Sequence, residues 1–135
     1  MVKRTIEEAP AYVAAFKEAY AAPEHRRFYS DGGEAAVLMV HGFPGTPAEL
    51  RHLARAFAGL GWSVDVPLLP GFGTDIETLF DRTCEDWLEA IRKAYRALEE
   101  THGPVVLGGH SMGGAIATAV APELDPDGLI LLSPF

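Results

Sequence analysis

Short apolar runs alternate with amphipathic segments along most of the chain. Four such runs, at 35–40, 62–66, 104–108 and 128–132, have the length and composition of strands. The first reads Ala-Ala-Val-Leu-Met-Val without polar alternation, which is typical of a strand buried on both faces of a parallel sheet. Since segments with helical spacing separate the runs, the pattern predicts an α/β fold, a mostly parallel sheet with helices on both faces.

The segments between these runs carry helix-start signals. Thr46-Pro47-Ala48-Glu49 combines an N-cap threonine, a proline at the first helical position and a glutamate three residues after the cap. A second, longer helix is expected after the cap at Thr83, and a third after Ser111. The residues expected on the inward face of the first helix are Leu50, Leu53, Phe57 and Leu60, and those of the second are Trp87, Ile91, Ala94 and Leu98.

The first residues predict an amphipathic helix within 1–22, lying on the body of the protein. Thr5-Ile6-Glu7-Glu8 resembles a capping box, and apolar residues follow at helical spacing. A short strand is expected near 27–30. No repeat or linker interrupts the chain, so we expect a single domain over 1–135, whose strands and site-bearing loops occupy 36–135.

Composition narrows the classes of partner. A formal net charge of −8 opposes binding to nucleic acid or to an anionic membrane surface. No stretch approaches the roughly 20 apolar residues of a membrane span, and the first residues lack the apolar run of a signal peptide. The single cysteine, Cys84, excludes an internal disulfide framework and fits a reducing compartment. We therefore expect a cytoplasmic protein without an integral membrane segment.

The candidate chemistry centres on Gly109-His110-Ser111-Met112-Gly113. This segment matches Gly-x-Ser-x-Gly, in which a serine nucleophile lies on a sharp turn from a strand to a helix. Glycines on both sides remove side chains that would collide with the neighbouring strand and helix. The segment also follows an expected buried strand and begins an expected helix, so we predict that Ser111 is catalytic.

A second segment, Val-His-Gly-Phe-Pro-Gly at 40–45, follows the first buried strand. In acyl transfer the oxyanion needs two backbone N–H donors, one from the residue after the nucleophile and one from a loop across the site. Met112 and Phe43 fit these two roles, because Pro44 has no N–H to donate. We expect His41 to brace this loop, beside the close-packed Gly42, and not to act as the catalytic base.

With these segments in place, the chain from about residue 36 resembles the N-terminal half of an α/β-hydrolase, similar to bacterial carboxylesterases and monoacylglycerol lipases. The resemblance rests on His-Gly-Phe-Pro-Gly at 41–45, Leu-Pro-Gly-Phe-Gly at 69–73 and Gly-His-Ser-Met-Gly-Gly at 109–114. It implies hydrolysis of a carboxylic ester with an apolar acyl group, through an acyl-enzyme. Many relatives have Gly-His-Gly where this chain has a phenylalanine at position 72, which makes that wall of the site more apolar.

The catalytic base and its acidic partner are missing from the expected positions. The resemblance implies the order serine, then aspartate or glutamate, then histidine, but no histidine follows Ser111. The acidic residues after it, Glu123, Asp125 and Asp127, are expected in a turn away from the site. The last expected strand, at 128–132, would also form an uncovered apolar edge of the sheet. We therefore expect a second chain, or a C-terminal remainder, to supply further strands together with the Asp and His.

Two alternatives stay open at this point. The visible half determines the nucleophile but not the leaving group, so a related hydrolase of amides, thioesters or carbon–carbon bonds is the alternative among enzymes. A catalytically silent binding protein of the same fold is the other alternative. No metal or organic cofactor is expected, because acyl transfer of this type needs neither.

Overall fold

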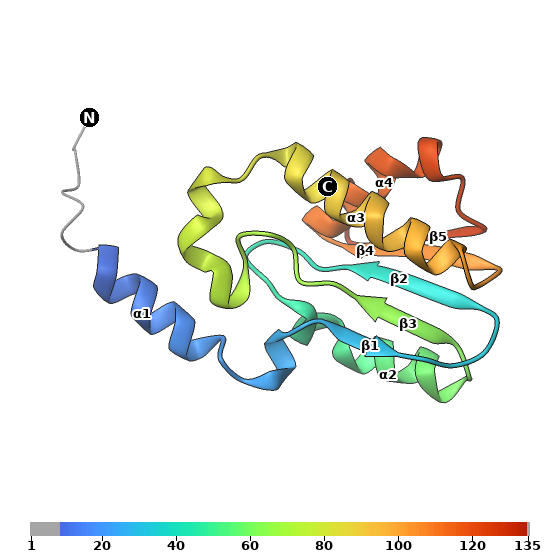
Figure 1. Ribbon diagram of the computed structural model, residues 1–135, viewed down its shortest axis with the longest axis horizontal. Helices are drawn as coiled ribbons and strands as arrows, with labels where there is room; N and C mark the ends of the chain where they lie inside the picture. Colours follow the sequence, from blue (N-terminus) through green and yellow to red (C-terminus); the bar gives the residue numbers. More distant parts are fainter. Residues whose placement is uncertain (1–8, 135) are drawn as a thin grey trace.

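The computed structural model describes residues 9–134, which form a five-stranded sheet with helices on both faces (Figure 1). The strand order is β1-β3-β2-β4-β5, with β1 antiparallel to β3 and all other neighbours parallel. The predicted α/β class and mostly parallel sheet are therefore confirmed. The strands are β1 (Phe28–Ser30), β2 (Ala36–Val40), β3 (Ser63–Val66), β4 (Val105–His110) and β5 (Gly128–Leu132). The α-helices are α1 (Ala9–Ala19), α2 (Arg51–Gly59), α3 (Cys84–Glu99) and α4 (Met112–Leu124), and the 3-10 helices are η2 (Pro23–His25), η3 (Pro47–Leu50) and η4 (Gly73–Asp81).

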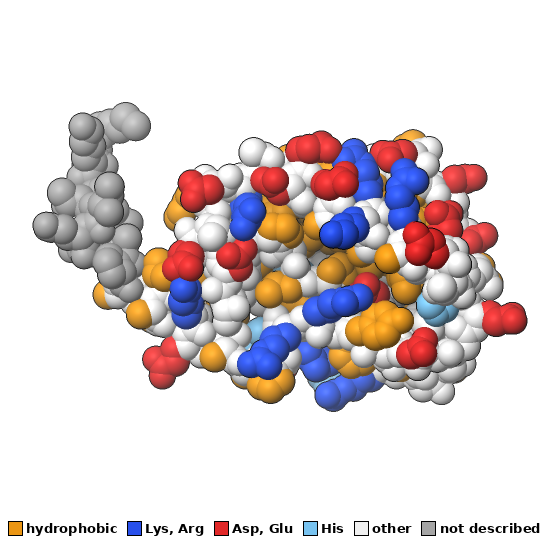
Figure 2. Space-filling model, in the orientation of Figure 1, with side chains coloured by type: hydrophobic (Ala, Val, Ile, Leu, Met, Phe, Trp, Pro, Cys, Tyr) orange, Lys and Arg blue, Asp and Glu red, His pale blue; other side chains and the backbone are white. Residues whose placement is uncertain are grey.

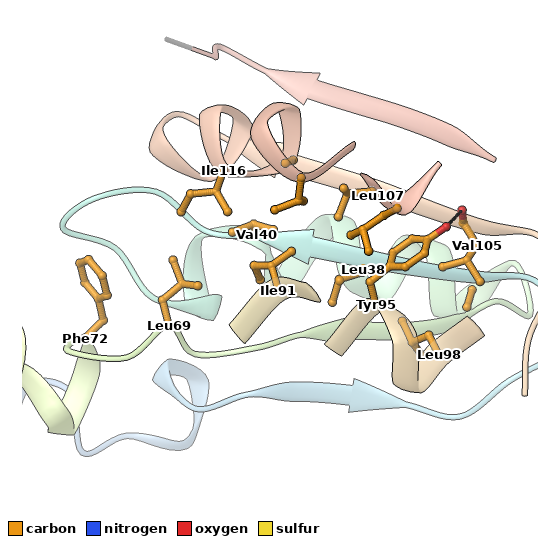
Figure 3. Packing of buried hydrophobic residues seen from close by; sticks show 14 residues of the cluster. Leu38, Val40, Leu69, Phe72, Ile91, Tyr95, Leu98, Val105, Leu107 and Ile116 are labelled. Carbon is orange, nitrogen blue, oxygen red and sulfur yellow. Dashed lines mark hydrogen bonds between the residues drawn. The ribbon is translucent and has the colours of Figure 1, made fainter. Parts of the chain in front are cut away.

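The central strand β2 divides the core into two layers. All five of its residues are buried, as the absence of polar alternation predicts. Leu38 and Val40 face a cluster built with α3 and α4, drawn in Figure 3, and Val37 and Met39 face a second cluster built with α2. The two clusters cover opposite faces of the sheet, which explains why every residue of this strand is apolar.

Most predicted helices are present, with two local differences. The segment after Thr46 begins as the 3-10 helix η3 and becomes α-helical only at Arg51. Leu60, expected on the inward face, is 76% exposed, because α2 ends at Gly59. The cap of α3 is confirmed, since Thr83 and Asp86 exchange side-chain and backbone hydrogen bonds.

The N-terminal helix is described only in part. The capping-box residues 5–8 lie outside the described residues, and α1 begins at Ala9. Its Lys17 Nζ lies 2.7 Å from the Glu77 carboxylate on η4, while Phe16 remains 47% exposed. The helix therefore contacts the body through η4, but much of its aromatic surface faces solvent.

The two edges of the sheet differ in polarity. Beside β1, the buried Asp65 of β3 accepts two hydrogen bonds of 2.8 Å from Arg27, and the bond to Asp65 raises the pKa of that arginine. At the opposite edge, β5 pairs only with β4, and its Leu129 and Leu131 are 42% and 38% exposed. Within residues 9–134, no further strand covers that apolar edge.

Charged side chains cover the outer surface of α3, where acidic and basic groups are interspersed (Figure 2). Glu123 at the end of α4 pairs with Arg92 and Arg96 of α3 at 2.9 Å, so it is not merely a solvated turn residue. Asp127 accepts a hydrogen bond from the N–H of Val105, at the start of β4 and away from Ser111. No helix in the described part of the chain is long and apolar enough to cross a membrane.

Candidate active site

The predicted strand-to-helix turn is present at Ser111, between β4 and α4. Ser111 has φ 55° and ψ −125°, a conformation that costs energy for a residue with a side chain. Two glycines make the turn possible. A Cβ on Gly109 would lie 2.2 Å from the carbonyl oxygen of Gly113, and a Cβ on Gly113 would lie 2.1 Å from the carbonyl oxygen of Val40. The spacing of the motif thus follows from backbone contacts on both sides of the serine.

In the first turn of α4, the N–H of Met112 is free directly beside the serine. The N–H groups of Gly114 and Ala115 donate to the Ser111 carbonyl at 2.9 and 3.3 Å, and the Ser111 N–H donates to the Leu132 carbonyl at 3.0 Å. No acceptor within residues 9–134 is recorded for the N–H of Met112. An unpaired N–H at a helix N-terminus suits a developing negative charge.

The loop at 41–45 lies against this turn, at the end of β2. A Cβ on Gly42 would be 3.0 Å from the Ser111 Cβ, so only glycine fits there without displacing a neighbour. The N–H of Gly45 donates to the Gly42 carbonyl at 2.9 Å, and the N–H of Gly42 donates to the Glu49 carboxylate. For the N–H of Phe43, the described residues provide no recorded acceptor. The loop therefore presents the Phe43 N–H as a free donor beside the serine turn.

His41 is fully buried and uses both ring nitrogens. The N–H of Leu69 donates to its Nε2 at 3.0 Å, so the proton resides on Nδ1, which donates to the Gly42 carbonyl at 2.9 Å. Burial lowers the pKa of His41, because the charged ring would lose its hydration. Held neutral between two loops, His41 braces the loop at 41–45 and has no nitrogen left to accept the serine proton.

The lowered pKa of His41 predicts a pH-dependent stability. An unfolded histidine binds a proton with a pKa of about 6.5, whereas folded His41 resists it, so stability is present above that pH and is lost as the pH falls. We expect the free energy of unfolding to fall with a slope of up to ~1.4 kcal/mol per pH unit below about pH 6.5. Urea unfolding at several pH values between about 7.5 and about 5.5, on either side of that pKa, measures it. His52→Gln, at an exposed position, should keep the dependence of the unfolding free energy on pH, and His41→Gln should flatten it. Equal slopes in the two variants would contradict the assignment of this pH dependence to His41.

Glu49 is a site residue that the sequence pattern does not single out for this position. The pattern indicates a capping box with Thr46, but in the structure only Thr46 caps, accepting a bond from the N–H of Ala48, while the Glu49 carboxylate turns toward Gly42. Its second oxygen lies 3.4 Å from Nδ1 of His110. That nitrogen is buried and has no hydrogen-bond partner among the described residues. The sequence alone cannot distinguish a glutamate that completes a capping box from one that bonds to a neighbouring loop, because both occupy the same position after the cap.

Aromatic rings lie beside the loop at 41–45. The rings of Phe43 and Phe72 are 5.7 Å apart at 83°, and Phe72 also contacts Trp87 at 5.7 Å. Trp87 in turn donates a 2.9 Å hydrogen bond to the Pro70 carbonyl. Phe72, expected as an apolar wall of the site, is completely buried, whereas Phe43 is 55% exposed. Phe43 therefore provides the accessible apolar surface, and the buried ring of Phe72 packs against its inner side.

The remaining histidines lie elsewhere. His25 bonds to Thr46 at 2.8 Å, the Nδ1 of His102 lies 3.0 Å from the Leu98 carbonyl, and His52 is exposed on α2. Across residues 9–134, no hydrogen bond to the Ser111 hydroxyl is recorded, and no group of three or more potential metal ligands occurs. Residues 9–134 thus bring the turn at Ser111 together with the free N–H groups of Phe43 and Met112, and no histidine among them is hydrogen-bonded to the Ser111 hydroxyl.

Comparison with known proteins places this site in a family. Residues 37–135 match the model of the Alpha/beta hydrolase family. The chain belongs to this family. It is 39% identical over 100 residues to a thermostable monoacylglycerol lipase from Bacillus sp. (strain H-257), and 30% identical over 104 residues to a carboxylesterase from Bacillus subtilis (strain 168). These matches cover 74% and 76% of this chain, but 40% and 42% of the two relatives.

Two solved structures show a similar arrangement. A structure from work on LipS and LipT, two metagenome-derived lipolytic enzymes, superposes with a TM-score of 0.79 and 35% identity, covering 83% of this chain and 46% of that one. A thioesterase domain from the curacin biosynthetic pathway superposes with a TM-score of 0.64 and 28% identity, covering 80% and 40%. The chain thus spans less than half the length of each of these four proteins.

Proposed function

We propose that this alpha/beta hydrolase chain carries the nucleophile of a serine hydrolase that cleaves carboxylic esters through an acyl-enzyme. The observation that carries the proposal is the position of Ser111, on a strained turn next to two free backbone N–H groups, those of Phe43 and Met112. Similarity to a monoacylglycerol lipase and to a carboxylesterase supports an ester as the substrate.

The chemistry follows from this geometry. The Ser111 hydroxyl attacks the ester carbonyl carbon while a histidine base takes its proton, and the carbonyl oxygen becomes an oxyanion. The N–H groups of Phe43 and Met112 donate to that oxyanion, an interaction that strengthens only as the charge develops. Collapse of the tetrahedral intermediate breaks the C–O bond, and the alcohol leaves with the proton from the histidine. Water, activated by the same base, then hydrolyses the acyl-enzyme and restores the serine.

The base must come from outside the described residues. His41 is occupied at both nitrogens, and the Nδ1 of His110 lies against Glu49. We propose that residues of a second chain, or of a C-terminal remainder, add strands to the exposed edge of β5 and supply the triad His and Asp. The exposed Leu129 and Leu131 on β5 support this pairing, because an uncovered apolar edge strand tends to associate.

The substrate is expected to have an apolar acyl group. Phe43 exposes 55% of its surface beside the free N–H groups. The buried ring of Phe72 packs against it, and the half-buried ring of Trp87 packs against Phe72 in turn. An acyl chain laid against Phe43 would lose contact with water, which favours binding by roughly 25 cal/mol per Å² of apolar surface buried.

Hydrolysis of p-nitrophenyl esters tests the function, together with labelling by a fluorophosphonate that reacts with activated serines. The chain is assayed alone and with the polypeptide that completes its sheet. We expect turnover and labelling at Ser111, mapped by mass spectrometry, only in the completed protein. Turnover by the chain alone as a monomer would refute the external base. Absence of both signals in the completed protein would favour a catalytically silent binding protein of this fold.

Thioester hydrolysis is a second candidate, supported by the structural similarity to the curacin thioesterase domain. The same serine turn and oxyanion donors serve either leaving group. Comparing kcat/KM for a p-nitrophenyl ester and an acyl thioester of equal chain length distinguishes the two. A higher kcat/KM for the ester supports the carboxylesterase function. A higher kcat/KM for the thioester would instead identify the protein as a thioesterase.

A further inference from the structure

We propose that Glu49 is a positioning residue, which holds the oxyanion loop at 41–45 in place against the nucleophile turn. The inference rests on the proposed function, because only an oxyanion-binding loop has a catalytic position to be held in. Its structural part, the bond between Glu49 and the loop, is testable without any activity.

The first contact determines which amide of the loop is free. The Glu49 carboxylate accepts the N–H of Gly42, so this group is not available to a substrate oxygen. The next N–H along the chain, that of Phe43, has no recorded acceptor within residues 9–134, and Pro44 has no N–H. By occupying one of these two adjacent donors, Glu49 leaves the Phe43 N–H as the one of the pair that can donate to an oxyanion.

The second contact concerns space inside the turn. A Cβ on Gly45 would lie 2.7 Å from one oxygen of the Glu49 carboxylate and 2.9 Å from the other, and a Cβ on Gly42 would lie 3.4 Å from one of them. Glycine at 45 therefore leaves the space that the carboxylate occupies. The Glu49 side chain is 28% exposed, so its bond to the loop is partly shielded from water.

The third contact reaches the nucleophile turn. The other carboxylate oxygen lies 3.4 Å from Nδ1 of His110, the residue before Ser111, and the described residues offer this buried nitrogen no hydrogen bond. One carboxylate thus faces both the loop after β2 and the end of β4. Because the Phe43 and Met112 N–H groups belong to these two segments, Glu49 is placed to set the distance between them.

The test compares Glu49→Ala with Glu49→Gln in the catalytically complete protein, using Glu100→Ala, at the exposed residue directly after α3, as the control. In Glu49→Gln the amide oxygen still accepts from the Gly42 N–H. We expect Glu49→Ala to lower kcat for ester hydrolysis about 10- to 100-fold with KM changed less, because a misplaced donor weakens transition-state binding. Glu49→Gln should recover most of kcat, and the control should match the wild type. Equal losses in both Glu49 variants, or no loss in either, would overturn the proposal.

Amide hydrogen exchange at Gly42, followed by NMR, tests the bond itself. Exchange should be at least about tenfold faster in Glu49→Ala than in Glu49→Gln or in the wild type. If Glu49→Ala does not fold, Gly45→Ala replaces it, since its added methyl group displaces the carboxylate without removing it. Unchanged Gly42 exchange in the folded variant refutes the role of Glu49. A wild type without ester hydrolysis refutes only the proposed function, because the exchange measurement still reports on Glu49.

Discussion

Replacing Gly113 by alanine is expected to destabilise the protein by about 3 kcal/mol or more. The new Cβ would lie 2.1 Å from the Val40 carbonyl oxygen and 2.5 Å from that of His41. Both are backbone atoms of the central strand and the oxyanion loop, so neither can move aside by changing a side-chain rotamer. Relief requires α4 to shift away from β2, which would separate the two segments that carry the oxyanion donors.

The matched control is Gly59→Ala. Gly59 is the last residue of α2, and a Cβ added there would have no neighbouring atom within 4 Å among the described residues. Alanine also has the higher helix propensity, so this variant should lose no stability. Urea unfolding of both variants gives the comparison. If Gly113→Ala unfolds at the same urea concentration as Gly59→Ala, the inference that α4 lies too close to β2 for a side chain at position 113 is wrong.

Replacing Ser111 by alanine should lower kcat for ester hydrolysis about 10⁵-fold in the complete protein, since loss of the nucleophile removes the covalent route. Stability should not fall, because the hydroxyl has no recorded hydrogen bond in the described residues and the φ of 55° is equally unfavourable for alanine. Rates with p-nitrophenyl esters and covalent labelling by a fluorophosphonate provide the two measurements.

Ser30→Ala is the control for this experiment. Ser30 lies on β1, at the far edge of the sheet from β4, and its variant should react as the wild type does. Residual activity of Ser111→Ala within about tenfold of the wild type would exclude Ser111 as the nucleophile, since loss of a nucleophile costs far more. Retained labelling at another serine would lead to the same conclusion.

Local sequence patterns are sufficient to predict much of the fold. The uninterrupted apolar run of β2 predicts a strand covered on both faces, and the structure buries all five residues. The cap at Thr83 likewise predicts the start of α3, because a capping box involves only residues three apart. Such features depend on neighbours in the sequence, so no knowledge of the tertiary structure is needed to identify them.

Other features cannot be predicted from local patterns. Glu49 has the sequence position of a capping-box residue, yet its carboxylate bonds to Gly42 across the loop. The sequence predicts Phe72 as a wall of the site, but this ring is completely buried beneath Phe43. In both cases the side chain has several partners of suitable chemistry, and the packing of distant segments selects one of them.

The sequence by itself determined the strand-to-helix turn at Ser111, because Gly109, Ser111 and Gly113 lie within five residues and their spacing follows from the local backbone. It also determined the alternation of strands and helices that produces a mostly parallel sheet, through the alternation of apolar runs and amphipathic segments. Only the tertiary structure decided which loop groups remain free to bind an oxyanion. The Gly42 N–H is occupied and the Phe43 N–H has no recorded acceptor within residues 9–134, since that choice depends on where a carboxylate seven residues away from Gly42 comes to rest in space.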